Sequence, residues 1–165
     1  MTRNFYAACL GCYNAGRLHG VNIEASSDVD AMQEQVTAFF KPDSELAVHD
    51  SEGLGAWGEC FDLAGIAELC EFLETCEEAG IPGEIALSYR ENVNTDADAR
   101  EVVSTFEGTI DGSKEDWAEA KAAELGYELG KLERFIDWRA VAREWLMNIA
   151  EIKDTDGRIY LFGAT

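Results

Sequence analysis

The chain has 165 residues, of which 47% are hydrophobic and 10% aromatic, so it can fold around a core and is not a disordered acidic tail. Its 33 acidic and 13 basic residues give a formal net charge of −20 at pH 7, which argues against direct nucleic-acid binding because phosphate recognition needs clustered Lys and Arg. The five cysteines lack the spacing of a disulfide scaffold, and no apolar run approaches the ~18 residues of a membrane span. We therefore expect a reduced, cytoplasmic protein without membrane contact.

The first part of the chain, residues 1–58, predicts a small α+β domain. Alternating or continuous apolar runs predict strands, and a helix capped by Ser27 or Asp28 is expected to stop near Lys41, before Pro42. The expected order is a strand at 4–10, a turn at 13–16, a strand at 21–25, the helix, and a strand at 46–49. This order is a ββαβ unit.

Residues 59–102 predict an acidic helical domain. From Leu63 onward, apolar residues recur at three- and four-residue steps until Gly80 and Pro82 end the pattern; they are Ile66, Leu69, Leu73 and Cys76. On a wheel of 3.6 residues per turn, Glu71, Glu74 and Glu78 fall within about 60° of one another, opposite these apolar residues. Two shorter helices are expected at about 83–91 and 96–102.

Residues 103–165 predict a second α+β domain. We expect a strand at 102–110, a helix at 114–125 between Ser113 and Gly126, a helix at 137–147, and a terminal hairpin of strands 149–153 and 158–162. The expected fold class is α+β, an elongated chain of three small domains: 1–58, 59–102 and 103–165.

The negative charge is concentrated in the middle of the chain. Residues 42–89 hold twelve acids and neither Lys nor Arg, whereas residues 131–165 hold six acids and six bases. A helix with an acid every three or four residues presents carboxylates about every 5 Å, and several such helices side by side approach the charge density of a DNA duplex. We therefore predict an acidic partner-binding surface made of Glu59, Asp62, Glu68, Glu71, Glu74, Glu77, Glu78, Glu84, Glu91, Asp96, Asp98 and Glu101.

Three short motifs suggest chemistry and are interpreted as structural. Cys9 and Cys12 have a redox or metal spacing, but positions i and i+3 of a strand point to opposite faces and no second pair or His cluster completes a site. His49 and Asp50 lack a nucleophile context, so we expect them to fix the glycine-rich loop that follows. Residues 154–157 resemble a calcium loop without its twelfth-position acid, which favours a hairpin turn. We predict no catalytic residue, metal or cofactor.

Motifs at both ends of the chain carry a family resemblance. Residues 5–20, FYAACLGCYNAGRLHG, resemble the opening of ArdA antirestriction proteins, in which a Y-x-A-x-L strand leads into YN-x-G-x-L-x-G. Residues 47–52, AVHDSE, resemble their A-I-H-D-Y-E segment with Ser51 in place of Tyr. Residues 132–138, LERFIDW, followed by Ala142-Arg143, resemble their Y-I-D-Y-x-A-x-x-R segment with aromatic exchanges at Phe135 and Trp138.

The resemblance implies a non-enzymatic, dimeric protein of three small domains that imitates bent DNA. Such a protein would occupy the DNA-binding groove of type I restriction-modification enzymes, in particular the methyltransferase core, and protect incoming mobile DNA. The family attributes the dimer contact to the C-terminal domain. In this chain residues 131–143 are locally basic, so we expect a dimer contact that includes Arg134, Phe135, Trp138, Arg139 and Trp145.

Three alternatives stay open at this stage. Both Trp138 and Trp145 could be ordinary helix core. The acidic surface could be a mimic or adaptor aimed at another basic DNA-binding protein, such as a nucleoid protein, since the electrostatics would be the same. A hydrolase with an acidic cleft is disfavoured because the chain has only two His residues and no activated nucleophile.

Overall fold

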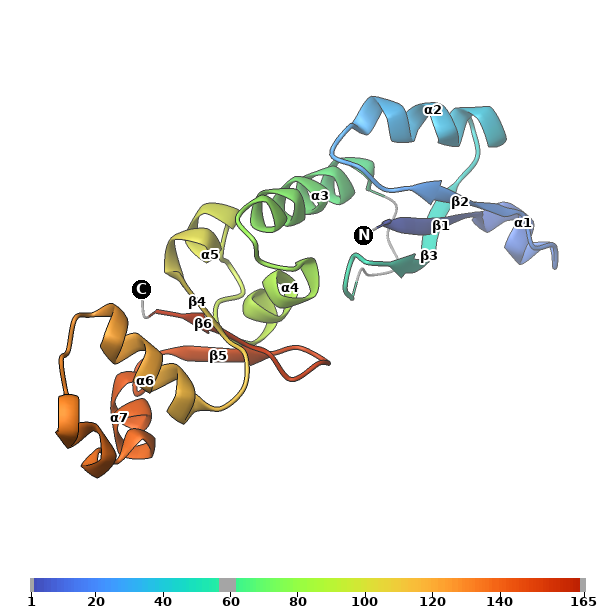
Figure 1. The fold of residues 1–165 in the computed structure, drawn as a ribbon. Coiled ribbons are helices and arrows are strands. Elements are labelled where there is room, and N and C mark those ends of the chain that lie inside the picture. The colour runs from blue at the N-terminus through green and yellow to red at the C-terminus, as the bar shows by residue number, and fades with distance from the viewer. Residues whose placement is uncertain (1, 57–61, 164–165) are drawn as a thin grey trace. The chain divides into compact units, whose positions relative to one another are not determined.

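The computed structural model describes residues 2–56 and 62–163 (Figure 1). Helices and strands are mixed along the chain, and the strands form two separate three-stranded sheets, which confirms the α+β class. The chain divides into two compact units, residues 1–87 and 88–165, with the boundary inside helix α4 (Gly83–Asn92). The division into three domains stays a prediction.

The first unit contains the predicted ββαβ order. Strands β1 (Asn4–Cys9), β2 (Gly20–Glu24) and β3 (Leu46–Glu52) form an antiparallel sheet in the order β2-β1-β3, and helix α2 (Val29–Phe39) connects β2 to β3. The side chain of Asp28 caps α2 by accepting from the Ala31 N–H at 3.1 Å. Phe5, Ile23 and Met32 are buried in the core of this unit.

Two details of this unit differ from the prediction. The segment expected to turn at 13–16 begins as a short helix, α1 (Leu10–Asn14), because the Cys9 side chain accepts from the Cys12 N–H and caps a helical turn. Strand β3 also continues to Glu52 instead of ending at His49, since its last residues pair with β1 beyond a β-bulge.

Helix α3 (Leu63–Glu78) matches the predicted apolar periodicity. Asp62 caps it by accepting from two backbone N–H groups, and Ile66, Leu73 and Cys76 are buried. Gly80 follows the C-terminal end of the helix. Its φ of 83° is the left-handed conformation that glycine adopts without strain, and the Ile81 N–H returns to the Cys76 carbonyl at 2.9 Å.

The second unit contains the remaining elements. After α4 come α5 (Ala99–Thr105), β4 (Phe106–Ile110), α6 (Lys114–Glu124), the 3-10 helix η1 (Gly130–Phe135), α7 (Trp138–Trp145), β5 (Ala150–Lys153) and β6 (Ile159–Phe162). The three strands form an antiparallel sheet in the order β4-β6-β5, and β5 and β6 make the predicted terminal hairpin.

The predicted strand at 102–110 is wrong over its first four residues. Val102 is buried on α5, and Thr105 closes the last turn by donating from its hydroxyl to the Glu101 carbonyl at 3.0 Å. β-Branched residues favour strands as isolated signals, but here burial against the unit core decides the conformation. The prediction also missed η1, which has no buried residue and therefore no apolar periodicity to reveal it.

Aromatic side chains fill the core of the second unit. Tyr89 and Phe162 are buried with ring centroids 4.8 Å apart, and Trp117 meets Trp145 edge to face at 6.2 Å where α6 packs on α7. Within the described ranges, no helix combines the length and the apolar character needed to cross a lipid bilayer.

Candidate acidic binding surface

Helix α3 presents the densest run of carboxylates on the first unit. Glu68, Glu71 and Glu78 are exposed, and their carboxylates make no hydrogen bond or ion pair with any residue of the described ranges 2–56 and 62–163. Because an α-helix rises about 1.5 Å per residue, the run from Glu68 to Glu78 extends over about 15 Å. The structure thus leaves these three predicted carboxylates available to a partner.

Two other glutamates of α3 are tied to the protein itself. The Ser27 hydroxyl donates to Glu74 at 2.8 Å, which holds the start of α2 against α3. Arg3 Nη2 lies 2.6 Å from Glu77 Oε1 as an ion pair, although it is not aligned as a hydrogen bond. Glu74 and Glu77 are partly buried, so they contribute less accessible charge than sequence reasoning assigned to them.

The carboxylates of α3 oppose the stability of their own helix. Negative charges near a helix C-terminus interact unfavourably with the macrodipole by about 0.3–1 kcal/mol each, and Glu77 and Glu78 stand in the last turn, which holds no basic residue. Like charges spaced three or four residues apart, as at Glu71, Glu74 and Glu78, cost about 0.2–0.5 kcal/mol per pair. Folding therefore does not account for this charge.

The remaining predicted acids also include exposed carboxylates and carboxylates that bond to the protein itself. Glu84 on the first unit, and Glu91 and Asp96 on the second, are exposed. Asp98 is exposed as well, although it caps α5 by accepting from the Glu101 N–H at 2.8 Å, whereas Glu101 is half-buried and accepts from Asn94 at 2.7 Å. Asp62, the cap of α3, is exposed as well as structural. Glu59 lies outside the described residues.

Sequence reasoning overlooked acids of α2 that belong beside this surface. Asp28 and Asp30 lie in or next to the first turn of α2, and the hydrogen bond from Ser27 to Glu74 brings that turn to α3. Both carboxylates are exposed. The only available signal in the sequence was that the two acids share a helix start, where such residues are usually interpreted as caps.

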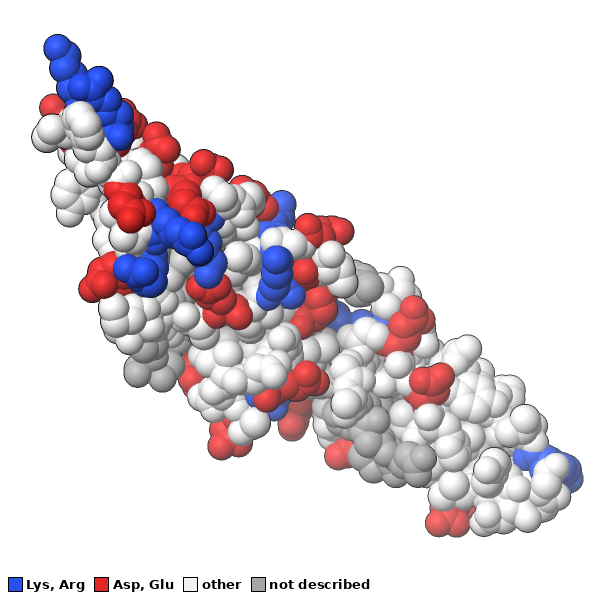
Figure 2. Space-filling model, turned by 90° about the horizontal axis from the view of Figure 1, so that it is seen from below, with Lys and Arg blue, Asp and Glu red and all other residues white. Residues whose placement is uncertain are grey.

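The second unit carries charges of both signs. Figure 2 shows Lys and Arg side chains interspersed among Asp and Glu over the part of this face formed by α6, η1 and α7, on the left of the view. Several of these charges are paired: Lys114 contacts Glu151 at 2.6 Å, and Lys121 contacts Glu124 at 3.0 Å. The predicted concentration of uncompensated charge is therefore a property of α3 and not of this face.

The residues predicted for a dimer contact lie on η1 and α7. The Arg134 guanidinium is 4.7 Å from the centre of the Phe135 ring, and Phe135 is 72% exposed. Arg139 is exposed and Trp138 is half-buried. Trp145 is also half-buried, and it packs on Trp117 within its own unit.

The two other motifs differ in outcome, since the hairpin turn is confirmed and the role of His49 and Asp50 stays a prediction. Asp154 organises the turn between β5 and β6 by accepting from the N–H groups of Asp156 and Arg158, which confirms a hairpin turn. His49 and Asp50 are exposed within β3, where Asp50 accepts from the N–H of its neighbour Ser51. Their environment holds no polarised nucleophile among the described residues.

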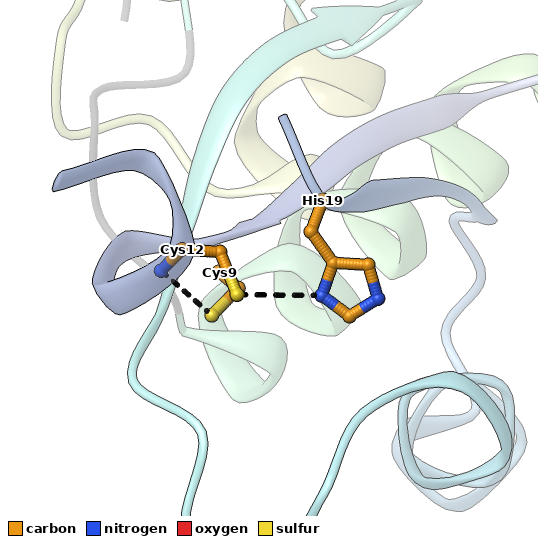
Figure 3. A group of neighbouring side chains, drawn as sticks. All are labelled: Cys9, Cys12 and His19. Carbon is orange, nitrogen blue, oxygen red and sulfur yellow. Dashed lines mark hydrogen bonds between the residues drawn. The ribbon is translucent and has the colours of Figure 1, made fainter. Parts of the chain in front are cut away.

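The expectation that Cys9 and Cys12 point to opposite faces is wrong. The strand ends at Cys9 and the helix α1 begins at once, so the two sulfurs converge, and His19 joins them (Figure 3). One ligand atom from each residue lies within 4.8 Å of the others, and Cys12 Sγ is 3.7 Å from His19 Nδ1. Hydrogen bonds from Cys12 lower the pKa of the Cys9 thiol, and the same interaction raises the pKa of Cys12.

Comparison with known proteins gives one family match. A family model described as antirestriction protein (ArdA) matches residues 5–156, which is most of the chain and includes α3, η1 and α7. No curated protein matches the chain.

Proposed function

The chain belongs to the ArdA family of antirestriction proteins, and from this premise we propose that it inhibits type I restriction-modification enzymes by occupying their DNA-binding groove as a DNA mimic. Members of the family are non-enzymatic inhibitors that act on restriction-modification enzymes. The proposal adds the class of target, the competition with DNA and the surface that competes. Its site of action is the cytoplasm, where such a target would meet incoming mobile DNA.

The unpaired carboxylates of α3 are the observation that carries this proposal. Glu68, Glu71 and Glu78 lack partners among the described residues, and they reduce the stability of the helix that holds them. A groove lined with Lys and Arg would supply the missing positive charge and release counterions, as it does when it binds phosphates. The energy of binding would then be spread over many carboxylates, so no single residue is essential.

Other acids extend the proposed surface along the chain. Every predicted member keeps its place in the proposal, with the exposed ones contributing most: Asp62, Glu68, Glu71, Glu78, Glu84, Glu91, Asp96 and Asp98. Glu74, Glu77 and Glu101 contribute less because each already has a partner in the protein. Asp28 and Asp30 of α2 are added because Ser27 ties their turn to α3.

Competition with DNA tests this function directly. A complex of a type I methyltransferase core with labelled target DNA is titrated with the protein at two salt concentrations. We expect stoichiometric displacement that weakens as the salt concentration rises, because the interaction is electrostatic. Absence of displacement at large excess would overturn the type I target. A basic nucleoid protein recovered instead from a host lysate would identify the alternative partner.

We also propose that the protein is a homodimer whose contact includes η1 and α7. Large apolar side chains are exposed along this stretch, among them Leu132 at 64%, Phe135 at 72% and Met147 at 63%. The stretch is locally basic, so two strongly acidic copies could meet there with less repulsion. Among the predicted residues, Arg134, Phe135, Trp138 and Arg139 are accessible enough to reach a second copy.

Sedimentation of a Phe135→Ala variant tests the dimer contact. We expect a shift toward monomer, because truncating an aromatic side chain that anchors an interface can cost about 2 kcal/mol or more. Leu18→Ala is the matched control, since Leu18 is an exposed apolar residue of the first unit, outside η1 and α7. An unchanged dimer in the Phe135 variant would remove η1 from the interface.

A further inference from the structure

We propose that Cys9, Cys12 and His19 form a binding site for a thiolate-preferring divalent cation of the Zn²⁺ type, with three protein ligands and a fourth position open to water. The two sulfurs and one ring nitrogen lie within 4.8 Å of one another. This site is separate from the acidic surface, so its existence does not depend on the proposed inhibition. Figure 3 shows the three side chains directed toward a common point.

The distance between the Cys12 sulfur and the His19 nitrogen suits tetrahedral coordination. With Zn–S bonds of about 2.3 Å and Zn–N bonds of about 2.0 Å, tetrahedral angles require about 3.6 Å between sulfur and nitrogen. The observed separation between Cys12 Sγ and His19 Nδ1 is 3.7 Å. Thiolate and imidazole are the ligands that Zn²⁺ takes most often, whereas Mg²⁺ and Ca²⁺ require oxygen.

The backbone fixes the positions of all three ligands before any ion arrives. β1 and β2 pair in register up to Ala8 and Gly20, and the Cys9 N–H donates to the His19 carbonyl at 2.9 Å, so these two residues stand opposite each other. The first turn of α1 then returns Cys12 to Cys9, and the Cys12 N–H donates to Cys9 Sγ at 3.2 Å. An N–H donor to a ligating sulfur is an outer-shell contact that supports metal ligation.

Packing also orients the imidazole. The His19 ring stacks on Phe39 with centroids 5.0 Å apart and meets the edge of Phe40 at 5.5 Å. Both phenylalanines come from the end of α2, which carries neither of the two sulfurs. The imidazole ring is therefore held by a separate element. A ligand whose rotamer is already restricted loses less entropy when it binds an ion.

The surroundings of the cluster leave room for the fourth ligand. Cys9, Cys12 and His19 line a solvent-open pocket together with Arg17 and Lys41. The two cations favour the thiolate forms that metal binding requires. An ion bound there would join the end of β1 to the start of β2 and so close the α1 connection between them.

Cobalt substitution and zinc competition test the site in the full-length protein. The reduced protein is titrated with Co²⁺, whose visible spectrum reports tetrahedral thiolate ligation, and then with Zn²⁺ against a chromophoric chelator. We expect one equivalent of tetrahedral Co²⁺ that Zn²⁺ displaces. Even outer-shell substitutions typically cost about 10–100-fold in metal affinity, so Cys12→Ser and His19→Gln should each cost at least about tenfold.

His49→Gln is the matched control, because His49 is an exposed histidine of the same unit outside the cluster. The affinity of this variant for Co²⁺ and Zn²⁺ should be unchanged. Circular dichroism establishes that each variant is folded. Failure of the reduced protein to bind either ion would overturn the proposal. Undiminished binding by a Cys12→Ser, His19→Gln double variant, or a Cys9–Cys12 disulfide in protein isolated from a reducing cytoplasm, would do so as well.

Discussion

Helices α3 and α6 are both acidic, but they distribute their charges in opposite ways. In α6 the acids Glu115 and Asp116 occupy the first turn, Lys121 occupies the last turn, and Ser113 caps the N-terminus. Each of these placements stabilises a helix. In α3 the first turn has no acid and the last turn has no base, and glutamates occupy the C-terminal half instead.

Ion pairs follow the same division between the two units. In the second unit, Lys114 pairs with Glu151 and Arg158 pairs with Asp111. In the first unit, residues 42–87 contribute no Lys or Arg at all. The ion pairs of the second unit thus serve its folding, whereas the charge of α3 needs a partner outside the chain to explain it. Each unit contains one interaction that departs from this division between paired and unpaired charge. Both interactions can be tested.

Arg3 is the exception on the first unit, since it is the cation that pairs with α3. Arg3 is 8% exposed and its partner Glu77 is 34% exposed. Arg3→Ala would leave Glu77 partly buried without a counter-charge. We therefore expect the unfolding free energy to fall by about 2–3 kcal/mol, which is at or below the low end of the cost of breaking a fully buried ion pair. Urea denaturation measures this loss.

Arg17→Ala is the matched control for Arg3. Arg17 is an exposed arginine of the same unit, and substitutions of such surface residues usually change stability by less than about 0.5 kcal/mol. Equal losses in the two variants would mean that removal of any base from this acidic unit is destabilising, and the specific role of Arg3 would be wrong.

Removal of the unpaired carboxylates of α3 should change inhibition and stability in opposite directions. In a Glu68→Gln, Glu71→Gln, Glu78→Gln variant we expect inhibition to weaken by about tenfold at low salt and the salt dependence to flatten, because fewer phosphate-like contacts remain. We expect the unfolding free energy to rise by about 1 kcal/mol, because like-charge pairs and an unfavourable dipole contact are removed. Competition assays and urea denaturation measure the two effects.

The control for this variant removes the same charge from the second unit through Glu107→Gln, Glu128→Gln and Asp156→Asn, all exposed. If both triple variants lose inhibition equally, net charge and not the α3 surface is responsible. Complete loss of inhibition from Glu71→Gln alone would indicate a specific contact instead of a distributed surface.

Local signals made most of the fold predictable from the sequence. The caps Asp28 and Ser113, together with the apolar period of α3, predicted three helices because each of these interactions is confined to one or two turns. The failures required tertiary information. The β-branched side chain of Val102 predicted a strand, and only the folded structure shows that this residue is buried on α5. The helix η1 was missed because it has no buried face and therefore no apolar pattern.

The candidate sites show the same limit. The exposed glutamates of α3 follow from helical periodicity alone. The pairing of Glu77 with Arg3 and the meeting of Cys12 with His19 could not be predicted, because each depends on how separate segments of the chain are placed in the fold. Interpretation of Cys9 and Cys12 failed because the boundary between β1 and α1 falls between them, and element boundaries are the weakest part of a sequence-based prediction.

Glu119 and Glu133 are the exception on the second unit, where an acid meets another acid instead of a base. A hydrogen bond shared with Glu133 raises the pKa of Glu119, and partial desolvation of the carboxyl and the charges of Glu133 and Asp116 act in the same direction. A raised pKa means that the folded protein holds this proton more tightly than the unfolded chain does. The charged pair therefore opposes folding above the folded-state pKa, and protonation removes that opposition as the pH falls toward the ordinary value of 4.5.

Glu119→Gln should accordingly be more stable than the parent protein near neutral pH, and the difference should shrink to nothing as the pH falls to that of an ordinary glutamate. The effect is small because the pair is at the surface, where water screens it. Thermal unfolding of both proteins across this pH range measures the difference, and Glu128→Gln removes one charge from the same unit without touching the pair. A Glu119 variant that keeps a constant advantage at every pH would show that repulsion from Glu133 is not what limits the stability of this unit. The second unit would then have no exception to the rule that its charges serve folding.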